Sequence, residues 1–376
     1  MTVMRLAFVI SCLEMGGAQR VAVLLIEELR RRGWQVCLIA TYSGRTTSFY
    51  RIPDGVETHT LSELTGQRRS RTLSRVLRVL ALKRLFQEFQ PTAIVSFLTD
   101  ANIATLLASR GLDVPKVVSE RSFPPSDKLP FLYRLLRKLC YPRASNVVMQ
   151  TTQGLGWLRS NIAAANGCVI PNPVVLPLPT AHPQVTPEEV VPSDAKLILA
   201  VGRLNMEKGF DLLVEAFLRL GSDAQGWTLA ILGDGPQRER LAAMCSGSTA
   251  VARVMLPGAV GNVSDWYRRA DLFVLSSRYE GFPNSLVEAM AHGCACVSVD
   301  CLTGPRDIIE HGVNGILTEP DSPAALSEGI RTAIADDALR LRLGSAAREV
   351  AAKYSIGKVT DMWEQHFHGT RTTAMQ

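Results

Sequence analysis

The sequence predicts an α/β protein with two Rossmann-like βαβ domains that face each other across a cleft. Its 376 residues exceed what one hydrophobic core usually serves, so two domains are expected. Short apolar segments rich in β-branched residues alternate with helical patterns, which is typical of parallel sheets covered on both faces. A stretch with seven prolines, residues 171–194, separates two such series.

The first series predicts an N-terminal domain over residues 1–175. Its strands are expected at residues 5–11, 34–40, 93–98, 116–120 and 146–151. A linker would cover 176–195, and a C-terminal domain 196–355. The strands of that second domain are expected at residues 197–204, 227–235, 252–258, 271–277 and 294–300, with helices over 209–220, 236–245 and 284–293. The last segment, 356–376, could cross back to the first domain.

Composition and charge narrow the class of protein. The chain is 47% hydrophobic and 20% charged, as expected for a globular protein. The first apolar run ends at Glu14, too early for a signal peptide or a membrane span, so we expect a cytoplasmic location. Eight cysteines without metal-ligand spacing predict neither a metal site nor a disulfide framework. Residues 1–175 contain 23 Lys and Arg against 11 Asp and Glu, whereas the remainder contains 18 against 24, so the first half is expected to face an anionic partner.

Ligands of such sheets bind beyond the carboxyl ends of the strands, so the loops after strands are the candidate sites. Gly16 and Gly17 follow the first strand, where glycine lets a ligand approach the backbone of a helix start near Ala18. The motif is not GxGxxG, and no acidic residue ends the second strand, so a nicotinamide cofactor is disfavoured. An ordinary tight turn is the alternative.

Two cations follow the first strand of the second domain. Arg203 and Lys208 lie between Gly202 and Gly209, and both could neutralise a diphosphate. Solvated surface charges are the alternative interpretation. The chain has no DxD motif, so we expect no metal and assign the cation role to this pair.

Two carboxylates, Glu280 and Glu288, lie in "YEGFPNSLVEAMAHG". Asn284 or Ser285 could cap a helix that ends at Gly293, with free amides toward a phosphate. Glu288, expected in the first turn, could accept hydrogen bonds from a ribose diol, and Glu280 could bind a sugar hydroxyl. The plainer alternative is that Glu288 only stabilises the helix dipole.

The segments "GRLNMEKGFDLLVEAF", "LAILGDGPQRERL" and "GPRDIIEHGVNGILTEP" resemble the family-4 retaining glycosyltransferases of GT-B fold, whose E-x7-E signature Glu280 and Glu288 match. The resemblance implies a metal-independent transfer of a hexose or N-acetylhexosamine from a nucleotide sugar, by family frequency a UDP-sugar, with no cofactor. It assigns Glu280, Arg203 and Lys208 to catalysis. The donor-binding residues that it implies are Gly16, Gly17, Arg203, Lys208, Gly281, Phe282, Pro283, Asn284, Ser285 and Glu288.

The acceptor side is less defined. Many relatives place a histidine in the first domain, but this chain has none between His59 and His182, so we name no general base. Asn102, Glu120 and Arg121 follow first-domain strands and are candidate acceptor contacts. The resemblance implies a lipid-linked or cell-surface glycan as acceptor, as in lipopolysaccharide or exopolysaccharide synthesis.

Two basic amphipathic segments, 68–84 and 128–143, could lie on an anionic membrane. The apolar face of the first moves roughly half a turn around the helix from Leu82 onward, so we expect a break or a roll near Ala81. The candidate membrane contacts are Arg71, Arg75, Arg78, Arg134, Arg137 and Lys138. Ordinary solvated helix faces are the alternative, and no motif supports nucleic-acid binding. We therefore expect peripheral attachment to the inner face of the cell membrane. A sugar-nucleotide 2-epimerase of similar fold and a non-catalytic partner subunit are the rival functions.

Overall fold

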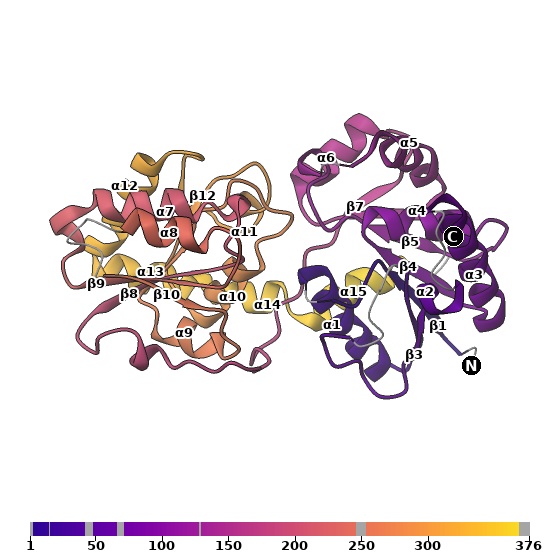
Figure 1. Ribbon diagram of the computed structural model, residues 1–376, viewed down its shortest axis with the longest axis horizontal. Helices are drawn as coiled ribbons and strands as arrows, with labels where there is room; N and C mark the ends of the chain where they lie inside the picture. The colour runs from indigo at the N-terminus through magenta and orange to yellow at the C-terminus, as the bar shows by residue number, and fades with distance from the viewer. Residues whose placement is uncertain are drawn as a thin grey trace, which may run out of the picture. The chain divides into compact units, whose positions relative to one another are not determined.

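The computed structural model describes residues 3–14, 16–41, 48–65, 71–127, 129–245 and 253–367, with the backbone alone at 64–65 and 71–73. The chain divides into two compact units (Figure 1). Unit 1 comprises Met1–Pro173 and Ile356–Gln376, and unit 2 comprises Val174–Ser355. Each unit is a parallel sheet with helices on both faces.

Within its described residues, unit 1 has a seven-stranded parallel sheet of order β3-β2-β1-β4-β5-β6-β7. Its strands are β1 (Arg5–Ile10), β2 (Gln35–Ala40), β3 (Glu57–Thr60), β4 (Ala93–Phe97), β5 (Lys116–Ser119), β6 (Asn146–Met149) and β7 (Gly167–Val169). Its helices are α1 (Gly17–Arg31), α2 (Leu61–Thr65), α3 (Arg71–Phe89), α4 (Thr99–Ala108), α5 (Phe131–Cys140), α6 (Thr152–Asn161) and α15 (Ile356–Glu364).

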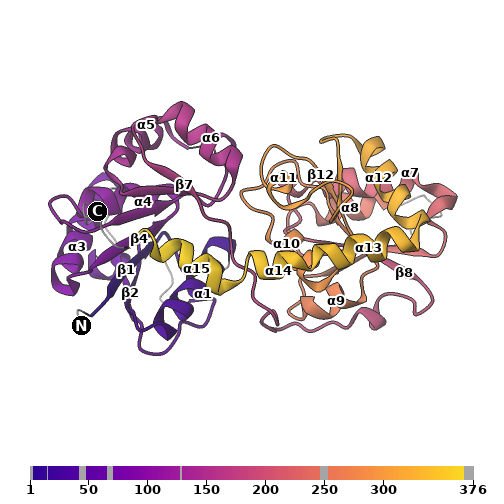
Figure 2. The same cartoon turned by 180° about the vertical axis from the view of Figure 1, so that it is seen from behind.

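Alternating side chains of β1 fill the two faces of this sheet, as the two-residue period of a strand requires. Leu6 and Phe8 pack in the core formed with α1 and α15, and Ala7 packs in the core formed with α3. Figure 2 shows α15 beside α1. Trp363 of α15 is 1% exposed, and Arg32, after α1, pairs with carboxylates of α15. The final helix therefore belongs to the first unit.

Unit 2 has, over its described residues, a six-stranded parallel sheet of order β10-β9-β8-β11-β12-β13. Its strands are β8 (Lys196–Val201), β9 (Trp227–Leu232), β10 (Val254–Gly258), β11 (Leu272–Leu275), β12 (Cys296–Val299) and β13 (Ile316–Thr318). Its helices are α7 (Phe210–Arg219), α8 (Arg238–Cys245), α9 (Val263–Arg269), α10 (Asn284–His292), α11 (Pro305–Ile308), α12 (Pro323–Ala335), α13 (Asp337–Ala347) and α14 (Glu349–Lys353).

Several sequence expectations need correction. The short strands β3, β7 and β13 were not predicted. The proline-rich segment is no free linker: the Ala181 amide donates to the Gly261 carbonyl at 2.9 Å, and the Trp266 indole donates to the Val185 carbonyl at 2.8 Å, so the segment packs on unit 2. No break divides α3, which runs as one helix through Ala81; the buried residues from Leu82 onward fit the alternative, a roll of its apolar face. Among the described residues, no helix has both the length and the apolarity that a bilayer crossing requires.

Candidate functional site

The strand order of unit 2 reverses between β8 and β11, which are hydrogen-bonded neighbours. Their loops, residues 202–209 and 276–283, therefore lie side by side at the carboxyl edge, where open parallel sheets bind ligands. Gly209 shows how closely the loops approach: its φ is +59°, and a Cβ there would lie 2.1 Å from the Ser276 carbonyl oxygen. Both φ and contact require glycine.

The close approach of the two loops brings together two side chains whose contact the sequence did not predict. Lys208 Nζ lies 2.7 Å from Glu280 Oε1 and 3.0 Å from Oε2. Glu280 is only 7% exposed, and the Ser277 hydroxyl also donates to Oε1 at 2.6 Å. A buried carboxylate needs such partners, and Lys208 and Ser277 supply them at the carboxyl edge of the sheet.

Further side chains that sequence reasoning missed fix these two loops. Arg278 makes two hydrogen bonds to the Asp211 carboxylate, at 2.8 and 2.9 Å, and one to the Met206 carbonyl. The Thr303 hydroxyl donates to the Glu280 carbonyl. Arg278 was visible as a cation directly after a strand, but its partner on α7 depends on the β8–β11 contact.

The Glu288 side chain is buried in α10 at the same edge. The Tyr267 hydroxyl of α9 donates to Glu288 Oε2 at 3.2 Å, and Glu288 is 7% exposed. Two details correct the sequence prediction. The residue preceding α10 is Pro283 and provides no side-chain cap, so neither Asn284 nor Ser285 is the cap, and Glu288 lies in the second turn. The helix does end at Gly293, whose φ is +86°.

The other predicted donor residues of unit 2 surround this pair. Arg203 is exposed after β8, whereas Phe282 and Pro283 are buried and Asn284 begins α10. Gly281 and Ser285 are half-buried. The arrangement presents two cations, two carboxylates and a helix N-terminus at one edge, which suits a polyol that carries phosphate groups.

Gly16 and Gly17 lie at the corresponding edge of unit 1, between β1 and α1. Gly16 precedes α1 in an extended conformation, and Gly17, its first residue, is exposed. In this sheet the strand order reverses between β1 and β4, so the predicted glycines lie at the point where ligands bind.

The candidate acceptor contacts are mostly buried. Asn102 is fully buried and donates to the Ser119 carbonyl and the Tyr141 hydroxyl. Glu120 is 1% exposed and accepts hydrogen bonds from the hydroxyls of Tyr141 and Thr99. Burial raises the pKa of the Glu120 carboxyl, although Arg137 at 3.7 Å acts to lower it. Asn102 and Glu120 therefore support the loop after β5 from inside rather than reaching an acceptor.

Arg121, the third candidate, is half-buried. Its guanidinium lies 4.2 Å from the Phe97 ring centroid and donates to the Asn172 side chain. Of the three predicted contacts, Arg121 has the exposure that a ligand contact requires.

The predicted membrane contacts separate into two groups. Arg75, Arg134 and Lys138 are exposed, and Arg78 is half-buried. The structure corrects the assignment of Arg137, which is 5% exposed and lies 4.7 Å from the Trp157 ring centroid. The side chain of Arg71 lies outside the described residues.

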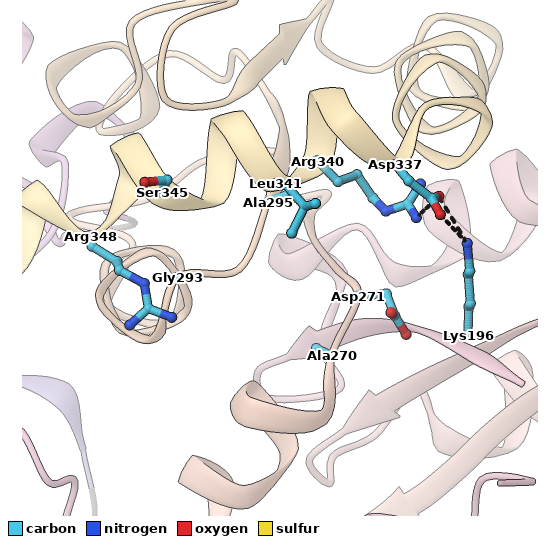
Figure 3. Close-up of a pocket in the computed structure, with 10 residues that line it drawn as sticks. All are labelled: Lys196, Ala270, Asp271, Gly293, Ala295, Asp337, Arg340, Leu341, Ser345 and Arg348. Atoms are coloured by element: carbon cyan, nitrogen blue, oxygen red, sulfur yellow. Dashed lines mark hydrogen bonds and ion pairs between the residues drawn. The ribbon is translucent and has the colours of Figure 1, made fainter.

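Two further features involve other residues. Ligand atoms of Cys37, Glu57 and His59 lie within 4.8 Å of one another, but burial raises the pKa of the Cys37 thiol to about 12, so the thiol keeps its proton at neutral pH. A pocket of about 460 Å³ lies by the amino ends of β8 and β11, where Lys196 pairs with Asp337 (Figure 3).

Comparison with known proteins identifies the class. Residues 16–173 match the glycosyl transferase 4-like domain, and residues 183–350 match the glycosyl transferases group 1 family. Two parallel Rossmann-like sheets with these matches define a glycosyltransferase of GT-B fold. The chain belongs to the family-4 type of these enzymes. The comparisons favour a transferase over the 2-epimerase and the non-catalytic subunit.

Curated relatives share this architecture. An α-1,4-N-acetyl-D-galactosaminyltransferase of Campylobacter jejuni, which acts on a GalNAc-containing diphospho-undecaprenol, is 25% identical over 96% of this chain and 97% of its own length. The amylovoran biosynthesis glycosyltransferase AmsD of Erwinia amylovora is 24% identical over 93% and 95%. An exopolysaccharide phosphotransferase of Streptomyces coelicolor is 32% identical over 60% of this chain, which spans 23% of that protein.

Solved structures show the same fold. Sucrose-phosphate synthase of Thermosynechococcus elongatus superposes with a TM-score of 0.81 at 21% identity, covering 96% of this chain and 98% of that one. HepE of Anabaena in complex with UDP superposes with a TM-score of 0.77 at 20% identity, covering 96% and 99%.

Proposed function

We propose that this chain transfers a hexose or N-acetylhexosamine from a UDP-sugar to a lipid-linked or cell-surface glycan, with retention at the anomeric carbon and without a divalent ion. The proposal rests chiefly on the ion pair of Lys208 with the Glu280 carboxylate at the switch point of unit 2, where Arg203 is exposed in the same loop as Lys208. The UDP complex of HepE and the lipid-linked substrate of the Campylobacter relative support the choice of donor and acceptor class.

Charge stabilisation accounts for the chemistry. As the bond to the diphosphate breaks, negative charge grows on the leaving group, and Lys208 and Arg203 would stabilise it. Glu280 would hold a hydroxyl of the donor sugar, and Glu288 a ribose diol. Each carboxylate is already oriented by a neighbouring hydroxyl, Ser277 and Tyr267 respectively, so little reorganisation is needed on binding.

We further propose that unit 1 attaches peripherally to the anionic inner face of the cell membrane. Exposed apolar side chains lie next to exposed cations on α5, where Leu139 is 55% exposed beside Lys138, and on α3, where Val76 is 53% exposed beside Arg75. Co-sedimentation with phosphatidylglycerol vesicles that is unaffected by Arg75→Glu and Lys138→Glu would contradict the attachment.

A direct assay tests the transfer. Purified chain is incubated with UDP-glucose, UDP-GlcNAc or UDP-GalNAc and a polyprenyl-diphosphate saccharide, with and without EDTA, and the product is analysed by mass spectrometry and NMR. We expect an α-linked product from an α-linked donor and an unchanged rate in EDTA. Inversion, or activity lost in EDTA and restored by Mg²⁺ or Mn²⁺, contradicts the mechanism.

A further inference from the structure

A second pocket, in unit 1, has no role in donor binding. It has a volume of about 480 Å³ and is lined by the loop after β5, by α5 and by α6, which lie near each other in both views of the molecule. The volume lies within the range of small-molecule sites, roughly 300–1,000 Å³. This α5–α6 pocket lies between α5 and α6, and the loop after β5, which leaves the carboxyl edge of the sheet, forms one part of its wall.

Positive charge dominates the pocket. Arg134, Arg137 and Lys138 line it against one carboxylate, that of Asp127. Arg134 and Lys138 are exposed, and with Phe131 they follow the three- and four-residue spacing that puts side chains on one helix face. The pocket therefore favours an anionic ligand.

Arg137 has donors that the protein leaves unused. Its side chain is 6% exposed, yet Nε and Nη1 have no hydrogen-bond partner among the described residues. The Glu120 carboxylate lies 3.7 Å from Nη1, too far for a hydrogen bond. Nε and Nη1 are shielded from solvent, so Arg137 adds its positive charge to the pocket lining without presenting these two donors to a ligand.

Apart from Asn161, the rest of the lining is apolar. Trp157, Ile162 and Pro124 form the inner part, and Phe131 and Leu135, at 72% and 42% exposed, form the outer part. Leu139 continues the exposed apolar row along α5. A water-soluble anion such as a sugar phosphate gains nothing from such a wall, whereas the apolar chain of an amphiphile would bury it.

We propose that the α5–α6 pocket binds the diphosphate of a lipid-linked acceptor, with its apolar chain lying along Phe131, Leu135 and Leu139. The proposal rests on the proposed function and specifies where the acceptor is held. Arg137 and the two exposed cations contact the diphosphate, and Trp157 packs beneath the Arg137 guanidinium.

Calorimetric titration with farnesyl diphosphate tests the site. The full chain is used with saturating UDP, so that the donor site of unit 2 is filled. We expect Arg134→Gln combined with Lys138→Gln to weaken binding by at least about tenfold, since two charge-assisted contacts are lost. Arg159→Gln is the matched control, because Arg159 is an exposed cation of α6 that does not line the pocket, and it should leave the affinity unchanged.

Arg137→Lys is a second variant, which keeps the charge near Glu120 but removes the planar set of donors. We expect it to weaken farnesyl diphosphate binding severalfold without changing the affinity for UDP. Thermal unfolding of each variant without ligand separates misfolding from lost binding.

Further probes identify the source of the anion. Inorganic pyrophosphate should bind at least about tenfold more weakly than farnesyl diphosphate, because it lacks the chain. Equal affinities, or binding that the double substitution leaves unchanged, overturn the proposal. The proposal is also overturned if the double variant no longer binds phosphatidylglycerol vesicles but still binds farnesyl diphosphate. A chain that binds UDP but not farnesyl diphosphate refutes this site alone, whereas one that binds neither UDP nor any UDP-sugar refutes the proposed function.

Discussion

Replacing Lys208 by alanine should damage both the stability of unit 2 and its affinity for UDP. The substitution leaves Glu280 buried with Ser277 as its remaining donor in the ion-pair cluster. Breaking a buried pair on one side costs about 3–5 kcal/mol. Because the Lys208 side chain is 24% exposed, we expect about 2 kcal/mol, which lowers the melting temperature by about 4–8 °C.

The same substitution removes a charge-assisted contact to the diphosphate, worth about 1.5–3 kcal/mol, so the Kd for UDP should rise by about 10- to 100-fold. Glu280→Gln is the matched variant, since it removes the opposite charge and leaves the Lys208 ammonium without a paired carboxylate at Glu280. It should keep or tighten UDP binding while turnover falls, because a neutral amide oxygen is a weaker acceptor for the sugar hydroxyl than a carboxylate.

Differential scanning fluorimetry and isothermal titration of the two single variants and the double variant measure these effects. If Lys208→Ala and Glu280→Gln weaken UDP equally, Lys208 acts only by positioning Glu280, and our assignment of Lys208 to the phosphates is refuted. If Lys208→Ala changes neither the melting temperature nor the Kd, the ion pair has no energetic role.

Three further predictions concern supporting contacts. Tyr267→Phe removes the hydroxyl that donates to Glu288, so UDP should bind about 3- to 10-fold more weakly. The substitution should leave the affinity for 2′-deoxy-UDP unchanged, and an equal loss of affinity for both ligands would exclude Glu288 as the ribose contact. The hydrogen bond from Arg31, with help from Arg32, lowers the pKa of Glu28 to about 2. This carboxylate therefore stabilises unit 1 above about pH 4.5, and the effect is lost as the pH falls toward 2. In urea titrations across this range, Glu28→Gln should abolish this pH-dependent part of the unfolding free energy, which is about 1–2 kcal/mol after solvent screening. Deleting residues 356–376 uncovers the core contacts of Val359 and Trp363, each worth about 1.5–3 kcal/mol, and should lower the melting temperature of unit 1, which an unchanged unfolding curve would contradict.

The sequence located the central strands well, because buried parallel strands are continuous apolar runs. Leu6 to Ile10 and Leu272 to Leu275 are such runs. The edge strand β3, with the sequence ETHT, has no apolar run, since it is polar and four residues long. A segment of this kind becomes a strand through pairing with β2, which no local pattern reports.

The residues of the candidate site could be predicted from the sequence, but the contacts between them could not. Arg203, Lys208 and Glu280 were recognisable because each follows a strand. That Lys208 pairs with Glu280 depends on β8 lying beside β11, a tertiary fact. Arg137 was misassigned because the helical pattern predicts only which face of α5 a residue lies on. Its burial results from the packing of α5 against Trp157 and Glu120, which the pattern does not report.

The charges at the switch point limit what the protein alone can neutralise. Arg203 and Lys208 contribute two positive charges at this edge, against the two carboxylates of Glu280 and Glu288. Because Lys208 already pairs with Glu280, a bound diphosphate would share Lys208 with that carboxylate. The N-terminus of α10 adds roughly half a charge. In the proposed mechanism, the exposed Arg203 would be the cation most available to the departing phosphate, and Lys208 would link that phosphate electrostatically to Glu280, the proposed sugar contact. An ion pair placed this way lets bond cleavage and sugar orientation depend on one lysine.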